Sequence, residues 1–388
     1  MVNRRRSRSR SAVAAASALA LGGLLARCAS SRGPAATPTA PTSLAPATVA
    51  PSGVAGGPLT PVAIGFTDTE HGMLLTASCA TSCTFKALTT DDGGDAYQAA
   101  GVVTQDPTDV PGVVDGLLVN GPDAMAWGQG GAWLSQNDGR TWSPHKLADG
   151  VQDIVSAVAV GRSWWVLQDP SGHGSGGDVI LTSDDGGATF SGLAGTVPAG
   201  VLSLARGDVD SAVLLYDDHL AVTLDAGVSW ASRARPCPAG PFADGEGLVA
   251  EAPDSTIWLA CGGEPSAGFQ AKALYVSADS GRTWTTVENC IPDPNACTWP
   301  GGTTGYLAAL ASPAAASVWM GAARGSLVGS IDGGRTWLTP LVGGGDLGAT
   351  RIYFLDPDHG WAIVERQVWR TTDGGNSWRP AGQLGGAR

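Results

Sequence analysis

Seven short motifs in this sequence place an acidic or amide side chain beside hydroxyl groups, a combination that could transfer protons or bind a cation. They follow the pattern Ser/Thr-x-Asp-x-Gly-x-Ser/Thr-aromatic, which is clearest at Ser277–Trp284 and Ser330–Trp337. An Asp in such a motif can accept hydrogen bonds from the backbone of a tight turn, and the Gly supplies a positive φ. We therefore interpret these side chains as groups that stabilise turns by hydrogen bonds rather than as catalytic groups: Asp92, Asn137, Asp185, Asp225, Asp279, Asp332 and Asp373.

The spacing of the motifs predicts the fold. They begin at residues 90, 135, 183, 223, 277, 330 and 371, and short β-rich segments precede each of them, as in 351–355, 361–364 and 367–370. Repeats of 40 to 54 residues that consist of short strands are typical of β-propellers. Abundant Gly (56) and Trp (14), with only 15% charged residues, agree with this class. We predict an all-β fold over residues 60–388, a single seven-bladed β-propeller of four-stranded antiparallel blades.

The motifs resemble Asp-boxes, and residues 60–388 are similar to the BNR/Asp-box propeller superfamily. The turns Asp68–Gly72 and Asp356–Gly360 both end in His-Gly and are followed by a Thr-x-Asp-Gly-Gly box. This arrangement resembles the photosystem II assembly-factor type of propeller. The resemblance implies a binding scaffold without a cofactor, and it does not identify the ligand. The last blade is completed either by 378–383 alone or by a strand from the N-terminal side.

Propeller topology assigns the motifs and the irregular loops to opposite faces. Strands a to d run outward from the axis, so the a–b turns and the c–d turns, which hold the boxes, share one face, here called the box face. The b–c and d–a connections form the other, the loop face. Binding usually resides in variable loops on a rigid scaffold, so we expect an unknown protein or glycan partner at the loop face. Its irregular segments are 79–83, 168–178, 261–271, 290–302 and the segment that holds Cys237.

An enzymatic alternative is an exo-sialidase-like or other glycoside hydrolase that acts on surface glycans. Sialidases need arginines that grip a carboxylate, a Tyr–Glu pair and an acidic proton shuttle. Their Arg-Ile-Pro motif is replaced here by Pro-Val-Ala-Ile-Gly at 61–65, and the five His are scattered without a catalytic motif. Endo-glucanases of the Asp-box class usually have two propellers. We predict no catalytic residues and no metal. The residues we expect around the axial mouth of the loop face, as a candidate binding site, are Glu246, Tyr306, Arg324 and Arg351.

Residues 1–28 have the features of an export signal. The basic segment Arg4–Arg10 precedes Ser11–Ala26, an apolar stretch of 16 residues that is short for a membrane span. Cys28 follows small and apolar residues as in a bacterial lipobox, although Arg27 stands where the lipobox has Gly or Ala. We expect an extracytoplasmic protein that is either anchored to the cell membrane by a lipid on Cys28 or secreted. Residues 29–59, rich in Ala, Pro and Thr, are expected to form a disordered tether.

The other six cysteines are even in number, as expected for disulfides in an exported domain. Their loop positions suggest the pairs Cys79–Cys83, Cys237–Cys261 and Cys290–Cys297, and their spacing is unlike that of zinc sites. Six basic residues precede Cys28, so the rest of the chain has 17 basic and 35 acidic residues, a net charge of −18. Such a charge excludes nucleic acid as a partner and leaves a lipid anchor as the only membrane contact. We expect a monomer.

Overall fold

The computed structural model describes residues 58–106, 114–128, 131–145, 147, 153–169, 178–193, 197, 200–238, 243–341 and 348–382. The chain divides into two units, Met1–Val54 and Ala55–Arg388, and all described residues belong to the second. The predicted export signal, Cys28 and most of the predicted tether therefore lie outside the described residues. No helix in the described ranges is long and apolar enough to cross a membrane.

Seven sheets of four antiparallel strands follow one another along the chain, each strand pairing with the next. The first four blades are β1 (Thr60–Phe66), β2 (Gly72–Cys79), β3 (Cys83–Thr90) and β4 (Gln98–Asp106); β5 (Gly116–Asn120), β6 (Asp123–Gly128), β7 (Gly131–Ser135) and β8 (Ser143–His145); β9 (Asp153–Val160), β10 (Ser163–Asp169), β11 (Val179–Ser183) and β12 (Ser191–Gly192); and β13 (Ser203–Ala205), β14 (Ala212–Leu215), β15 (His219–Thr223) and β16 (Ala231–Ala234).

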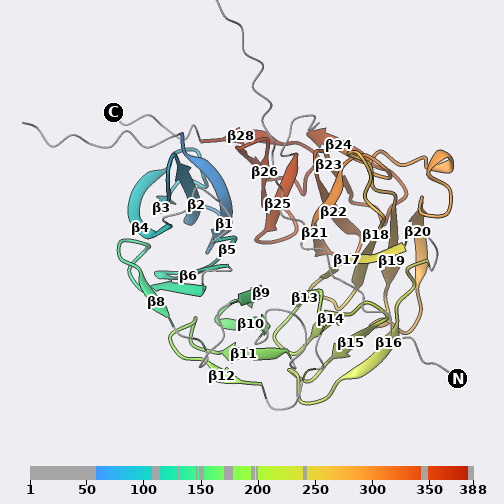
Figure 1. The fold of residues 1–388 in the computed structure, drawn as a ribbon, viewed down its shortest axis with the longest axis horizontal. Coiled ribbons are helices and arrows are strands. Elements are labelled where there is room, and N and C mark those ends of the chain that lie inside the picture. The colour runs from blue at the N-terminus through green and yellow to red at the C-terminus, as the bar shows by residue number, and fades with distance from the viewer. Residues whose placement is uncertain are drawn as a thin grey trace, which may run out of the picture. The chain divides into compact units, whose positions relative to one another are not determined.

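The last three blades are β17 (Ala243–Glu251), β18 (Ile257–Gly263), β19 (Lys272–Ser277) and β20 (Thr285–Asn289); β21 (Tyr306–Ala314), β22 (Ser317–Ala323), β23 (Leu327–Ser330) and β24 (Leu338–Leu341); and β25 (Ala349–Phe354), β26 (Gly360–Val364), β27 (Gln367–Thr371) and β28 (Arg379–Ala381). A 3₁₀ turn, η1 (Pro294–Ala296), lies between β20 and β21. Figure 1 shows the sheets in a ring, with β1, β5, β9, β13, β17, β21 and β25 innermost. The predicted seven-bladed propeller is confirmed, and every box lies between the third and fourth strands of its blade.

The hydrophobic core consists of seven clusters, each shared by two neighbouring blades. The box aromatics enter these clusters as half-buried side chains that pack against the preceding blade, as Trp142 does against blade one. Four further tryptophans on the second strand of their blades have no exposed surface: Trp164, Trp258, Trp319 and Trp361. Truncating such a side chain typically costs about 3–5 kcal/mol, so packing between neighbouring blades contributes substantially to the stability of the ring.

The ring closes through side chains instead of a shared strand. β28 pairs with β27, so the C-terminal segment completes the last blade, and blade one is built from four strands of its own. At the seam, the rings of Phe66 and Trp361 stack with centroids 3.6 Å apart. The Tyr353 hydroxyl donates to the Phe66 carbonyl (2.8 Å), and Trp361 Nε1 donates to the Gly93 carbonyl (3.0 Å). Arg370 adds hydrogen bonds to the carbonyls of Asp92 and Thr69, so aromatic packing and side-chain hydrogen bonds together close the seam.

Candidate functional site

The box carboxylates are occupied by their own turns. In the box of blade six, Asp332 Oδ1 accepts from the Ser330 hydroxyl (2.8 Å) and the Thr336 amide (2.9 Å), and Oδ2 accepts from the Thr336 hydroxyl (2.6 Å). The Ser330 hydroxyl in turn accepts from the Gly334 amide (2.8 Å). The same four bonds recur around Asp185, Asp225, Asp279 and Asp373.

Two boxes use variants of this network. In blade two the Asn137 amide nitrogen donates to the Thr141 hydroxyl (2.9 Å), so the side-chain bond runs in the opposite direction. In blade one Ala96 offers Asp92 its backbone N–H but no hydroxyl. The pKa of Asp185, Asp279 and Asp332 is lowered to about 2. The main cause in each box is the threonine at the seventh position of the motif, whose hydroxyl and backbone amide both donate hydrogen bonds to the carboxylate. These carboxylates are ionised at neutral pH and accept hydrogen bonds from the turn.

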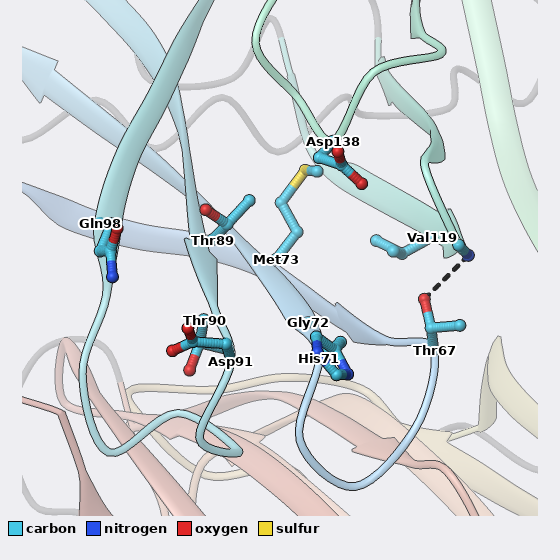
Figure 2. A pocket seen from close by; sticks show the side chains of 11 residues that line it. Thr67, His71, Gly72, Met73, Thr89, Thr90, Asp91, Gln98, Val119 and Asp138 are labelled. Atoms are coloured by element: carbon cyan, nitrogen blue, oxygen red, sulfur yellow. Dashed lines mark hydrogen bonds between the residues drawn. The ribbon is translucent and has the colours of Figure 1, made fainter.

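A hollow of about 180 Å³ on the box face lies where the turns of blades one and two meet (Figure 2). Its wall includes His71, whose Nδ1 lies 3.0 Å from both carboxylate oxygens of Asp68, and the hydrogen bond from this carboxylate raises the pKa of the imidazole. At another wall Thr67 accepts from the Gly121 amide (2.9 Å), the bond drawn in Figure 2. His359 and Asp356 repeat the His–Asp contact in blade seven. The two His-Gly turns thus use their imidazoles in local turn contacts.

The residues expected at the axial mouth of the loop face make separate contacts with the backbone. Arg351, on β25, donates to the carbonyls of Thr350 (2.9 Å) and Asp115 (3.2 Å), the latter at the start of blade two. The hydroxyl of Tyr306, at the start of β21, accepts from the Gly268 amide (2.7 Å) in the β18–β19 loop. Arg324 follows β22 in a turn with a φ of 59°.

The described hydrogen bonds and ion pairs join none of Tyr306, Arg324 and Arg351 to another. Glu246 lies in β17, and its side chain is outside the described residues. Burial raises the pKa of Asp115 and lowers that of Arg351, while the attraction between the two opposes both shifts. Arg351 is therefore positioned toward blade two, and Tyr306 toward the loop of blade five.

The structure adds a residue that the sequence did not single out. Lys272 begins β19 at the loop face and has no exposed surface. Its ammonium donates to the carbonyls of Gln270 (2.9 Å), Thr304 (3.0 Å) and Gly305 (2.9 Å). Burial lowers the pKa of Lys272 to about 7, and the three carbonyl acceptors favour the charged form. A lysine within the apolar stretch Ala271–Leu274 was the one signal in the sequence that pointed to it.

Lys272 joins two loops, 264–271 and 290–305, here called the blade-five platform. Backbone bonds run from Gln270 N to Thr303 O (3.0 Å) and from Gly305 N to Gly268 O (2.9 Å). Two disulfides, Cys237–Cys261 and Cys290–Cys297, lie beside and within the platform, and Cys79–Cys83 closes the β2–β3 turn of blade one. These are the pairs that the loop positions suggested.

Comparisons with known proteins identify the fold. No family model and no curated protein sequence matches the chain. Among solved structures, YCF48 bound to a D1 peptide is 18% identical with a TM-score of 0.54, covering 82% of this chain and 95% of that one. YCF48 from Cyanidioschyzon merolae is 16% identical with a TM-score of 0.54, covering 84% and 98%. An ancestral GH74 enzyme is 12% identical with a TM-score of 0.56, covering 84% of this chain and 46% of the enzyme.

The chain is a seven-bladed β-propeller with a box motif in each blade. At these identities the likeness concerns the fold, and the same fold serves a protein with a bound peptide and an enzyme. What this propeller does must therefore be argued from its own surfaces. In the described ranges, no three His, Cys, Asp or Glu side chains lie close enough together to hold a metal ion.

Proposed function

We propose that this Asp-box propeller is a non-catalytic, extracytoplasmic binding scaffold that recognises its partner with the loop face of blade five. The observation that carries the proposal is the stiffened platform. A buried ammonium, backbone bonds between two loops and two disulfides cross-link an irregular surface. Loops that are ordered before binding lose less conformational entropy when a partner docks, and affinity rises accordingly.

The disulfides also bear on where the scaffold works. Three disulfides are typical of proteins that fold in an oxidising compartment. This agrees with the predicted export signal in residues 1–28. A lipid on Cys28 would keep the propeller at the membrane, whereas cleavage without lipidation would release it. Mass spectrometry of the mature N-terminus distinguishes these two outcomes.

The first test concerns the hydrolase alternative. The purified protein is incubated with fluorogenic sialosides and with β-glucans, alongside the variants Arg351→Met and Tyr306→Phe. We expect no turnover, because Arg351 donates to backbone carbonyls and the Tyr306 hydroxyl accepts a backbone amide. Turnover by the wild type that falls in either variant would show that a glycosidase site exists at the mouth and would refute the scaffold proposal.

The second test locates the binding face in the producing cell. A photo-crosslinking amino acid is placed at Ser266, an exposed position on the blade-five platform, or at Val228, which is 79% exposed on the box face. We expect discrete crosslinked products from position 266 and none of the same products from position 228. Identical products from both positions, or products from 228 alone, contradict recognition by the loop face.

A further inference from the structure

A buried arginine joins blades three and four on the box face. Arg206 begins the turn between β13 and β14 and is 9% exposed. One terminal nitrogen of its guanidinium donates to the carbonyl and the hydroxyl of Ser163 (3.1 and 3.2 Å), at the start of β10, and the other donates to the Val209 carbonyl (2.8 Å). The guanidinium carbon lies 4.4 Å from the centre of the Trp165 ring. Arg206 therefore links the a–b turn of blade four to blade three.

A buried glutamate joins the same turn to blade five. Glu251, the last residue of β17, is 6% exposed, and its Oε2 accepts from the amide of Gly207 (3.0 Å), the neighbour of Arg206 in the chain. The two backbones are in contact here, because a Cβ on Gly207 would collide with the Ala252 carbonyl oxygen. Arg206 and Glu251 thus hold one turn of blade four between blades three and five.

Each of these two side chains has one buried polar atom without a partner. Glu251 Oε1 and Arg206 Nε form no hydrogen bond in the described part of the chain. A buried carboxylate with an unpaired oxygen is unfavourable, whereas a neutral carboxyl group in the same place costs much less. Burial accordingly raises the pKa of Glu251 to about 7, although the Ser211 hydroxyl and Arg206 favour the charged form. Burial also lowers the pKa of Arg206, to about 10, so the guanidinium is charged at neutral pH.

The other charged side chains around this pair are aspartates. They are Asp208, which acts on both side chains, and Asp184 and Asp210, which act on Arg206. Asp254, in the turn that follows Glu251, accepts from the Thr256 amide (3.1 Å). The strands packed against β17, which are β13, β14, β18 and β21, carry no charged residue. Among these groups Arg206 is the only cation that can pair with the Glu251 carboxylate.

We propose that Arg206 and Glu251 form a switch in which loss of the Glu251 proton draws the guanidinium from blade three toward blade five. With the proton in place, Arg206 bonds to Ser163 as described above. Once the carboxyl group is ionised, its unpaired Oε1 needs a donor and the unpaired Nε–H of Arg206 needs an acceptor, so a charge-assisted pair satisfies both. The bonds to Ser163 and the contact with Trp165 are given up in exchange.

The two arrangements differ in how they connect the blades. In the protonated form the a–b turn of blade four is tied to blades three and five, whereas in the ionised form an ion pair ties it to blade five and blade three is released. An element with two discrete arrangements converts a small change of pH near neutrality into a change of surface. The switch goes beyond the proposed function, because it concerns the box face and requires no partner.

The Trp165 ring reports the position of the guanidinium, because the cation lies over it only in the protonated form. The purified protein is labelled with fluorotryptophan, and the Trp165 signal, one of 14, is assigned in fluorine NMR spectra with Trp165→Phe. We expect this signal to shift between pH 6 and pH 8 with a midpoint at about pH 7, and to keep its pH 6 position in E251Q. The Trp319 signal, from a buried ring in blade six that is assigned in the same way, should not follow this transition.

Two further variants distinguish the switch from a merely structural role. Ser163→Ala removes one acceptor of the protonated arrangement, so the midpoint should move to lower pH. E288Q removes another glutamate of blade five whose pKa is raised by burial, and it should leave the Trp165 transition unchanged. Since Ser163→Ala keeps both Glu251 and Arg206, it tests the switch even if E251Q does not fold.

Three results overturn the inference. These are a Trp165 signal that stays in place between pH 6 and pH 8, a transition that persists in E251Q, and a midpoint that is unchanged or raised in Ser163→Ala. The last result would mean that Arg206 does not leave blade three. None of them bears on recognition by the loop face, which the crosslinks at position 266 test separately.

Discussion

Replacing Lys272 with methionine should loosen the blade-five platform without unfolding the propeller. The thioether has a similar length but no hydrogens to donate, so the carbonyls of Gln270, Thr304 and Gly305 lose their shared partner. These carbonyls can regain hydrogen bonds only from water, which requires the two loops to separate. The strands of blade five keep their own ladder bonds, so the opening remains local.

The size of the effect follows from opposing terms. A hydrogen bond from a charged donor contributes about 1.5–3 kcal/mol, which amounts to roughly 4–9 kcal/mol for three such bonds. The buried ammonium opposes this, because its desolvation lowers its pKa to about 7. We expect the free energy of local opening to fall by about 3 kcal/mol. Each 1.4 kcal/mol corresponds to a factor of ten, so amide protection in the platform should fall on the order of 100-fold.

Hydrogen–deuterium exchange read by mass spectrometry measures this directly. Peptides that cover 264–271 and 300–306 should exchange faster in Lys272→Met, while peptides from blade two should not change. Lys86→Met is the matched control, since Lys86 lies on β3 of a different blade and is only half-buried. Unchanged exchange in the two platform loops, or an equal increase in all blades, would refute the view that this ammonium joins the loops.

Three further predictions concern stability. Glu251 is 6% exposed and burial raises its pKa to about 7, so the folded state retains a proton that the unfolded state loses from about pH 4.5. The free energy of unfolding should therefore fall by up to about 3 kcal/mol as the pH rises across this window. Denaturation curves at pH 5 and pH 8 should show this fall in the wild type and not in E251Q. Asp332 has a lowered pKa, so its contribution to the free energy of unfolding is present above about pH 4 and is lost toward pH 2. Calorimetry at pH 7 should show that D332A melts at a lower temperature than D332N, because Asn137 already takes the place of the Asp in the box of blade two. Replacing both Cys237 and Cys261 with alanine opens a loop with a separation of 24 residues and should lower the unfolding free energy by about 3 kcal/mol in guanidinium titrations; no change would mean that the loop is ordered without the bond.

Local, repeated signals made the fold predictable. Each box closes its own turn through bonds between residues at most four apart, such as Ser330, Asp332 and Thr336, so the motif can be recognised without knowing the rest of the molecule. Seven copies then determine the number of blades. The loop-face disulfides were also accessible, because the repeat assigns each cysteine to a connection on a known face.

The candidate site was predictable only in part, because its contacts link distant segments through backbone atoms. Lys272 bonds to carbonyls 32 and 33 residues away, and every residue type has a carbonyl, so the sequence carries no mark of the acceptors. Arg351 was expected around the axial mouth, and its hydrogen bond to the carbonyl of Asp115, 236 residues earlier, could not be read from the sequence. The contact of Glu251 with the turn that holds Arg206 likewise depends on how neighbouring blades pack.

The seam between β1–β4 and β25–β28 implies a modular origin and a practical use. Because every described sheet is formed by consecutive strands of the chain, new ends introduced at another d–a connection, with the old ones joined by a linker, should preserve the 28 strands of the described residues. Duplication or loss of a complete repeat would likewise leave no strand without a partner in its sheet. Insertion of whole repeats therefore interrupts no sheet, and circular permutants offer a route to placing fused domains at different positions around the loop face.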